Sequence, residues 1–320
     1  MNKYLYKTIT LLLFAGLVMS LEQISKAQTC SCAGPPLLSS QDIASTSAGN
    51  LLVGLTFDYH NISDLYSGSH KLRDDTFRRY TKTLLLETDY GLTDRITLTA
   101  LLAWVQKKRN TTVSQTTGGP GDASLMFKYT LHKNTFTQQY ELTLGGGVKI
   151  PVGSSRLKDN DIQYQADMQP GTGAWGLQLW GHASKTFLPA STINAFAIVS
   201  YQMNGSNHRY QNSDFRYRFG NVFTGTAGLS DKIGAGFQLT LMLRYRRASR
   251  DQINTNNVAS TGGEWFNIVP GLNYRLTDNL MTRLSGQLPA WRNVNNTQPT
   301  TRFTASVSLF YSFQRTPFSF

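Results

Sequence analysis

Residues 303–313 read "FTASVSLFYSF", and this stretch decides the fold. Every second residue from Phe303 to Phe313 is apolar, and the residues between them are Thr, Ser, Ser, Phe and Ser. A period of two indicates a β-strand with two unlike faces. In a soluble sandwich the apolar face would enter a core, whereas in a membrane barrel it would meet lipid and the polar face would meet a wet lumen. The function depends on which of these environments the two faces meet.

The composition favours the membrane barrel. Charged residues make up 16% of the 320 residues, well below the roughly 25% that is usual for a soluble globular domain. After residue 27 the sequence has no run of about 18 apolar residues, so no transmembrane helix is readable. A low mean hydropathy combined with strong alternation is typical of a membrane barrel, because lipid-facing and lumen-facing residues cancel in any window.

Residues 1–27 have the features of a secretory signal peptide. Lys3 and Lys7 precede the apolar stretch "ITLLLFAGLVMSL", and Ser25 and Ala27 occupy the small-residue positions before a cleavage site. A single membrane anchor is the alternative, but the apolar run is short for one. Cleavage removes three lysines and one glutamate, which changes the net charge from +12 to +10. We expect this basic surplus to meet anionic lipid headgroups, including lipopolysaccharide, or anionic solutes, and not nucleic acid.

Twelve alternating segments place the barrel at residues 49–313. They cover residues 50–60, 80–90, 95–105, 122–131, 140–152, 173–187, 193–203, 215–229, 233–246, 264–276, 279–288 and 303–313. Short connections such as "GLTDRI", "GLSDKI" and "RLTDNL" alternate with long ones. An even strand number with short turns at one end and long loops at the other predicts an all-β fold, a transmembrane antiparallel up-and-down barrel in the outer membrane. Both termini are then expected on the periplasmic side, where the short turns lie.

Charged residues on the polar rows predict the lining of the lumen. An Arg or Lys facing lipid in mid-membrane would cost about 2–4 kcal/mol, so we place these residues on the inner face. Their basic excess favours a passive channel for anionic or hydrogen-bonding solutes. The alternative is that the charges pair across the barrel and fill it, as in a non-conducting structural or adhesive barrel. The predicted lining residues are Glu87, Arg95, Asp122, Lys128, Glu141, Lys149, Arg216, Arg218, Arg244, Arg246, Arg283 and Arg302.

No catalytic motif stands out, so we predict a protein that is not an enzyme and needs no cofactor. His182 beside Ser184 leaves a barrel-embedded lipid hydrolase as an alternative. Cys30 and Cys32 lie in the predicted periplasmic segment, residues 28–48. Two thiolates at this spacing suit a soft metal ion, and a strained disulfide is the other possibility.

Three motifs resemble one family of outer-membrane barrels. "GPGDASLMFKY" (119–129), "GGGVKIPVGSS" (145–155) and "QPGTGAWGLQLWGHASKTF" (169–187) are similar to strands of the transporters named for the phenol meta-cleavage degradation pathway. The resemblance is continuous over roughly residues 85–205 and looser toward the C-terminus. It implies a one-chain outer-membrane barrel that imports or exports small, often hydrophobic or aromatic, compounds.

The last alternating segment predicts how the barrel closes. We expect residues 303–313 to pair with residues 50–60, which removes the free edges of the sheet. Phe313 then matches the terminal aromatic position that the barrel assembly machinery reads in outer-membrane proteins. The tail, residues 314–320, contains Pro317 and offers Phe320 as the alternative signal.

Overall fold

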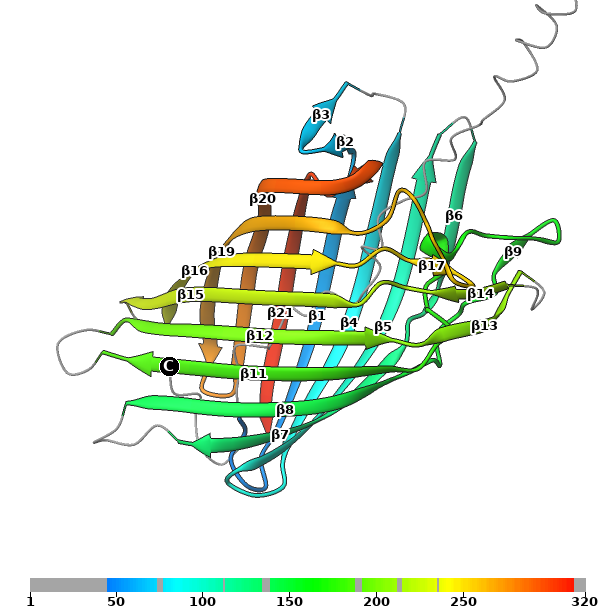
Figure 1. Ribbon diagram of the computed structural model, residues 1–320. Coiled ribbons are helices and arrows are strands. Elements are labelled where there is room, and N and C mark those ends of the chain that lie inside the picture. Colours follow the sequence, from blue (N-terminus) through cyan, green and yellow to red (C-terminus); the bar gives the residue numbers. More distant parts are fainter. Residues whose placement is uncertain are drawn as a thin grey trace, which may run out of the picture.

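Twelve long strands form one closed antiparallel barrel in the computed structural model (Figure 1). The structure describes residues 45–73, 77–111, 113–133, 139–187, 192–211, 215–234 and 236–313. The barrel strands, in order around the wall, are β1 (Leu51–Ile62), β4 (Arg78–Gly91), β5 (Ile96–Asn110), β7 (Ala123–His132), β8 (Tyr140–Ile150), β11 (Gly176–Thr186), β12 (Asn194–Asn204), β15 (Val222–Gly234), β16 (Phe237–Ala248), β19 (Gly263–Thr277), β20 (Leu280–Thr300) and β21 (Phe303–Phe313). Within the described residues, no helix has the length and apolar character needed to cross a membrane.

The two faces of β21 meet different environments, as predicted. Val307 is 50% exposed and Leu309 is 44% exposed on the outside of the barrel, whereas Thr304, Ser306 and Ser308 are buried on the inside. The apolar row therefore faces outward, where a lipid bilayer would surround it. Phe310, the apolar exception on the polar row, is fully buried.

Strands β1 and β21 close the barrel in the predicted pairing. Leu51 pairs with Phe313 at one end of the ladder, and Thr56 pairs with Ser308 near its middle. The Thr56 hydroxyl donates a hydrogen bond to Ser308 Oγ at 2.8 Å. Because each of the twelve wall strands is paired on both sides, the barrel wall presents no open edge to the membrane.

The eighth strand differs from the predicted one, residues 215–229. Residues Phe215–Arg218 form a separate short strand, β14, and the barrel strand β15 begins at Val222. "GLSDKI" is not a turn but part of β15, which pairs with β16 as far as Gly234. The chain reverses where Gly234 and Gly236 adopt φ angles of 143° and 83°. Glycine tolerates positive φ at little cost, so the reversal occurs there and not at the Ser–Asp pair.

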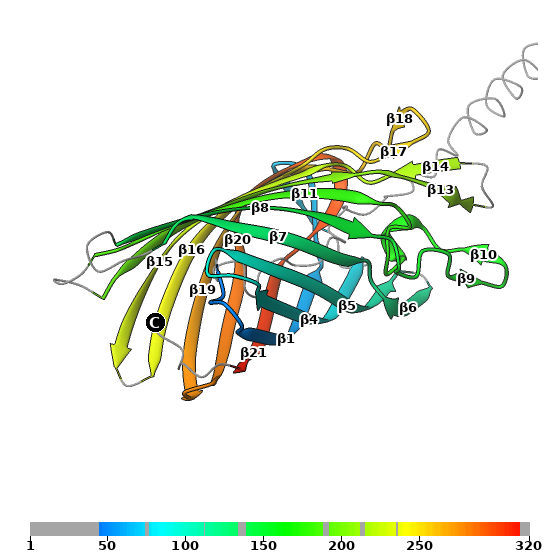
Figure 2. The same ribbon diagram turned by 90° about the horizontal axis from the view of Figure 1, so that it is seen from below.

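The long connections are themselves structured, and Figure 2 shows them gathered at one end of the barrel. Strand β5 extends beyond its predicted end and pairs with β6 (Ser114–Pro120), and β20 continues through the predicted loop to Thr300. A four-stranded sheet in the order β13-β14-β17-β18 stands apart from the wall. The remaining elements are β2 (Asp64–Gly68), β3 (His70–Leu72), β9 (Lys158–Asp159), β10 (Ile162–Gln163), the 3₁₀ helix η1 (Ala166–Met168), β13 (Ser206–Tyr210), β17 (Gln252–Ile253) and β18 (Asn256–Asn257).

The barrel interior contains an apolar cluster among its polar rows. Glycines on neighbouring strands make room for the large inward side chains: a Cβ added at Gly147 would lie 2.5 Å from Met126 Cγ. This close packing explains Gly147, and a Cβ at Gly145 would likewise lie 3.3 Å from the Trp180 ring, whereas Gly146 on the opposite face is not crowded. The cluster consists of Met126, Trp180, Phe196, Ile198, Met242 and Val269.

Candidate functional site

One buried carboxylate, that of Asp122, holds both ends of the long β8–β11 connection. Asp122 Oδ1 accepts a hydrogen bond from the Gly153 amide at 3.3 Å, and Oδ2 accepts one from the Thr172 amide at 2.9 Å. The Thr172 hydroxyl also donates to Oδ2. Lys149 Nζ lies 3.7 Å from the same oxygen and forms the ion pair. The carboxylate thus ties residues 153 and 172 to the start of β7.

The glycines of the three motifs leave room for this carboxylate. A Cβ at Gly153 or at Gly171 would lie 2.8 Å from Asp122 Oδ1, closer than real Cβ contacts allow. Gly153 and Gly171 also approach each other so closely that a Cβ on Gly171 would be 2.6 Å from the Gly153 Cα. The motif residues that are far apart in sequence therefore form one compact anchor.

Lys149 extends the anchor to the next strands. Its ammonium group donates hydrogen bonds to Thr172 Oγ1 at 2.8 Å and to Asn204 Oδ1 at 3.0 Å. The Asn204 amide in turn donates to the Gly220 carbonyl at 2.8 Å. The buried charge of Lys149 is satisfied by an anion and two polar oxygens, which is the condition for a stable buried ion.

The middle of the same connection is fastened to the barrel wall through Asp167, which lies in η1. Arg79 of β4 donates to Asp167 Oδ2 at 3.0 Å. Lys107 of β5 donates to the carbonyl oxygens of Asp167 and Gln169 at 2.9 and 2.7 Å. Arg109 adds a second ion pair with the Asp167 carboxylate at 3.6 Å. We call this group (Arg79, Lys107, Arg109 and Asp167) the loop latch.

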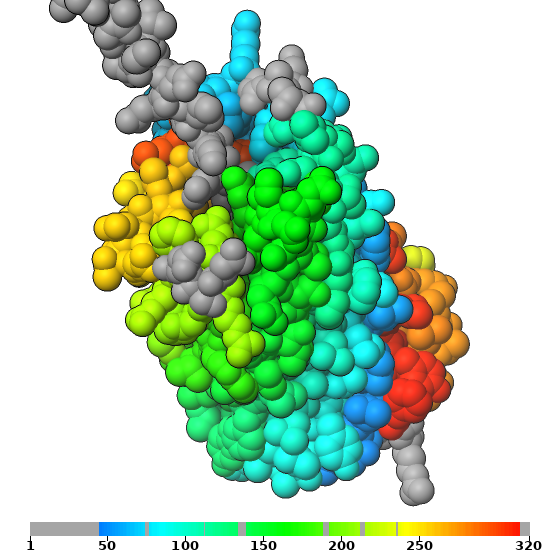
Figure 3. All heavy atoms as spheres, turned by 90° about the vertical axis from the view of Figure 1, so that its right-hand side faces the viewer, coloured from blue at the N-terminus to red at the C-terminus, as the bar shows by residue number. Residues whose placement is uncertain are grey.

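The other side of η1 packs on loops from the far half of the barrel. Ala166 belongs to a buried cluster with Tyr210, Tyr217, Phe219 and Val258, which lie in the connections after β12 and after β16. Helix η1 therefore bridges β4 and β5 to loops that start four or more strands away around the wall. In Figure 3, which looks at this end, the green segments lie between the cyan and the yellow ones. The β8–β11 connection thus covers the long-loop mouth.

Asp251 is another buried carboxylate of this loop layer. The Tyr217 hydroxyl donates to Asp251 Oδ2 at 2.6 Å, and the Gly220 amide donates to Oδ1 at 2.8 Å. Burial raises the pKa of Asp251 to about 6, although these hydrogen bonds and Arg246 act in the opposite direction. The pKa of Tyr217 is also raised well above its usual value, first by burial and second by the negative charge of Asp251.

The raised pKa of Asp251 predicts a loop layer that is more stable in acid. A pKa of about 6 against 3.8 in the unfolded chain corresponds to roughly 3 kcal/mol. This stabilisation is fully present below about pH 4 and is lost as the pH rises through 6. Relative to Asp251→Asn, which cannot titrate at this position, the wild-type loops should be cut faster by limited proteolysis at pH 7, and the difference in cutting rate should disappear as the pH falls to about 4. Equal pH dependence in both proteins would contradict this.

At the short-turn end, the residues before β1 lie against the inner wall. The Thr46 amide donates to Thr97 Oγ1 of β5 at 3.0 Å, and the Ser45 hydroxyl donates to Glu141 Oε1 of β8 at 3.1 Å. This segment therefore passes from β1 across β4 toward β8 on the inside of the barrel. Glu141, a predicted lining residue, holds it there. The predicted signal peptide, Cys30 and Cys32, and the tail 314–320 lie outside the described residues.

Seven further predicted lining residues lie on the inner side of the barrel, six of them on inner rows of wall strands and Asp122 directly before β7. Lys128 forms an ion pair with Asp89 at 3.1 Å, and Arg283 donates to Asn273 Oδ1 at 2.6 Å. Arg246 lies 4.8 Å above the ring of Trp265. Five of the seven are buried, namely Glu87, Asp122, Lys128, Lys149 and Arg283. The other two, Arg244 and Arg246, are half-buried.

Four predicted lining residues are not on the wall, and the structure corrects their placement. Arg95 is exposed in the short turn before β5, and Arg302 is exposed in the bend between β20 and β21. Arg216 and Arg218 are exposed on β14, outside the barrel wall. The prediction extended the alternation of β15 backward into β14 and began the strand of β5 one residue early, at Arg95. Arg302 was counted with the polar row of β21 although it lies just before the predicted segment 303–313.

The loop latch was missed because it begins where the predicted strands stop. Lys107 was assigned to a loop, residues 106–120, although it continues the inward row of Val105. Arg79 lies one residue before the predicted start of its strand, and Asp167 lies in a predicted loop. Extending the alternation of residues 95–105 by four residues would have found Lys107 and Arg109, but not their partner.

His182 and Ser184 share the inner side of β11, and His182 has a structural contact. Its ring is stacked with the Trp180 ring: the two ring centroids lie 6.0 Å apart and the ring planes differ by 8°. His182 is buried in the barrel interior, whereas Ser184 is half-buried.

Comparison with solved structures identifies the type of barrel. The chain is similar to the COG4313 outer membrane channel from Pseudomonas putida F1, with a TM-score of 0.69 and 17% identity over 85% of this chain and 98% of that one. It also matches the NanC porin (TM-score 0.44, 11% identity, 82% and 98% covered) and a Pseudomonas aeruginosa FadL homologue (TM-score 0.42, 11% identity, 83% and 91% covered). No curated protein matches the sequence. The fold is that of an outer-membrane barrel.

A family model described as "Putative MetA-pathway of phenol degradation" matches residues 47–313. This span contains the complete barrel, from β1 to the last residue of β21, and the Asp122 anchor with its glycines. The chain therefore belongs to that family, as the three motifs had indicated.

Proposed function

We propose that the protein is a passive outer-membrane channel for small solutes, preferentially compounds with an apolar or aromatic part. The observation that carries this proposal is the mixed inner face of the closed barrel: ion-paired charges such as Lys128–Asp89 stand beside an apolar cluster around Trp180. A wide hydrophilic pore would not need that cluster. Because the loop latch holds the β8–β11 connection over the mouth, the conduit is narrow.

The cations of β16 should give the channel a preference for anions. Arg244 is half-buried on the inner row and donates to Thr226 Oγ1 and Gln287 Oε1, both at 3.3 Å. We expect the reversal potential in a KCl gradient to indicate anion selectivity, and the double change Arg244→Ser with Arg246→Ser to move it toward zero. A fixed charge in a narrow pore lies close to every passing ion, so its removal should change the ion selectivity directly.

Arg247 supplies the matched control on the same strand. It is exposed and lies 3.5 Å from Glu264, so Arg247→Ser should leave the selectivity unchanged. Correctly folded protein that gives no current steps in planar bilayers would exclude the channel and favour a filled, structural barrel. Release of fatty acid by the purified protein, lost on Ser184→Ala, would favour the hydrolase instead.

The proposal also includes the topology and assembly predicted from sequence. We place the short turns and both termini in the periplasm and take β21, ending at Phe313, as the signal for the barrel assembly machinery. Cleavage after Ala27 leaves Cys30 and Cys32 in the periplasmic segment.

A further inference from the structure

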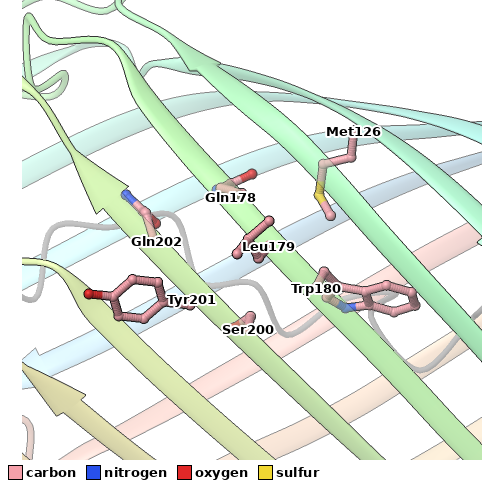
Figure 4. Close-up of a pocket in the computed structure, with 7 residues that line it drawn as sticks. All are labelled: Met126, Gln178, Leu179, Trp180, Ser200, Tyr201 and Gln202. Carbon is pink, nitrogen blue, oxygen red and sulfur yellow. The ribbon is translucent and has the colours of Figure 1, made fainter.

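The outer side of the barrel wall carries a group of exposed cations on two neighbouring strands. On the inner side, where β7, β11 and β12 lie near one another, Met126 and Trp180 leave space for about one water molecule (Figure 4). On the outer side of β4 and β5, Arg78, Lys82 and Lys108 are exposed near the ends from which the long loops start. We call these three residues the cation triangle.

Strand pairing gathers the cation triangle around one tyrosine. Arg78 and Lys82 lie on either side of Tyr80 on the outward row of β4, and Lys108 of β5 is the direct partner of Tyr80. Lys108 is therefore a diagonal neighbour of both other cations, and diagonal neighbours on one face of a sheet lie roughly 7–8 Å apart. Long side chains at this spacing can reach a common anion of the size of a phosphate group.

Within the described residues, no acidic side chain balances the cation triangle. The outward rows of β1, β4 and β5 contain no acid, because Asp58, Glu87 and Asp89 all belong to the buried inner rows. None of the three cations forms an ion pair there. By contrast, Arg247 at the long-loop end of β16 lies 3.5 Å from Glu264. The charge of the triangle therefore fits an anion that comes from outside the chain.

The cation triangle lies directly beside the apolar belt of the outer wall. Leu84, two residues from Lys82 along the outward row, is 44% exposed, and its partner on β5, Trp104, is 57% exposed. Tyr59 of β1 stacks with Tyr80, with 5.9 Å between the ring centroids. Tyrosine and tryptophan beside long cationic side chains are typical of the level of the lipid headgroups. The triangle therefore lies where headgroups meet the barrel, and the apolar belt lies where acyl chains do.

We propose that the cation triangle binds the phosphate groups of lipopolysaccharide in the outer leaflet, while the acyl chains lie along the outward apolar rows of β1, β4 and β5. The phosphate supplies the negative charge that these rows lack, and a lipid of the same leaflet reaches the site without leaving the membrane. The inference rests on the topology given under the proposed function, which places the long-loop end in the outer leaflet, and it does not depend on conduction.

Titration of fluorescently labelled lipopolysaccharide into the full-length protein in a zwitterionic detergent tests the site. The double change Lys82→Gln with Lys108→Gln removes two charges and keeps the length of both side chains. Each cation near an anionic lipid contributes about fivefold in affinity, so we expect the double variant to bind lipopolysaccharide about 30-fold more weakly. Dephosphorylated lipopolysaccharide should bind the wild type more weakly by a similar factor, because it lacks the anion that the triangle holds.

Lys185→Gln with Lys232→Gln is the matched control, because both lysines are exposed at the short-turn ends of β11 and β15 and the net charge falls by the same amount. It should bind lipopolysaccharide like the wild type. Heat-dependent gel mobility shows that each variant is folded, and if the first double variant is not, Lys108→Gln alone should weaken binding about fivefold.

Four results would overturn the proposal: unchanged affinity in the triangle variants, an equal loss in the control, equally tight binding of phosphatidylglycerol, or displacement of the lipid by millimolar inorganic phosphate. Binding in detergent requires neither conduction nor a particular orientation. A silent bilayer therefore counts against the channel and not against this lipid site, and labelling of the long loops on intact cells tests the topology separately.

Discussion

Replacing Asp167 by Asn should raise the single-channel conductance in planar bilayers. The Asp167 carboxylate is the anion of the loop latch, with Arg79 at 3.0 Å and Arg109 at 3.6 Å. Removing one partner of a buried ion pair costs about 3–5 kcal/mol, because the other charge stays buried without compensation. Departure of η1 from the wall relieves this cost by exposing the cations to water. The β8–β11 connection would then leave the mouth, and the narrowest part of the conduit would widen.

Asp159→Asn provides the control for this experiment. Asp159 belongs to the same connection and is exposed on β9, so the identical chemical change there should leave the conductance unaltered. A wild-type conductance in Asp167→Asn would show that the latch does not determine the pore size. A second check is Lys107→Met. It removes the β5 ammonium group that binds the carbonyl oxygens of Asp167 and Gln169, and it should also raise the conductance.

Replacing Asp122 by Ala should have the largest effect on stability. The carboxylate accepts from two backbone amides and one hydroxyl and balances Lys149, so its loss leaves several buried groups unsatisfied at once. We expect a loss of about 3–5 kcal/mol, the usual cost of removing one partner of a buried pair. The temperature at which the barrel loses its folded gel mobility should fall accordingly.

Asp278→Ala serves as the reference, because Asp278 is exposed in the turn between β19 and β20. Its gel-shift temperature should match the wild type. Gly153→Ala tests the anchor from the other side: the added Cβ would lie 2.8 Å from Asp122 Oδ1 and 2.7 Å from the Gly121 carbonyl carbon, and it should also destabilise. If both anchor variants melt like Asp278→Ala, the anchor contributes nothing to stability.

The wall of the barrel was predictable because the alternation of each strand is local. A side chain on a strand points to the face opposite that of its neighbours, so burial can be read two residues at a time. The β21 rows follow from this rule and are confirmed, and so is the predicted pairing of residues 303–313 with residues 50–60, which follows from closure of the barrel. The turn at "GLSDKI" was wrong because Ser–Asp and glycine compete locally for the reversal, and the backbone freedom of Gly234 and Gly236 prevailed.

The sites were less predictable because their members meet only in the closed barrel. Asp122 and Lys149 were selected as charged residues of inner rows, but as pore lining and not as an anchor for a loop. The motif glycines indicated the family, and their physical role emerged only when Gly153 and Gly171 were seen against the same carboxylate.

The amino-acid sequence by itself determined the barrel, its strand number, the outward apolar face and the closing pair of strands, because these depend on a period of two and on chain connectivity. Only the tertiary structure decided where η1 is held and which carboxylate binds both ends of its connection. Those outcomes depend on distances between strands that are far apart in sequence. In "FTASVSLFYSF" the two kinds of information meet: alternation places Phe310 on the inner row, and closure of the barrel buries it above Gly54.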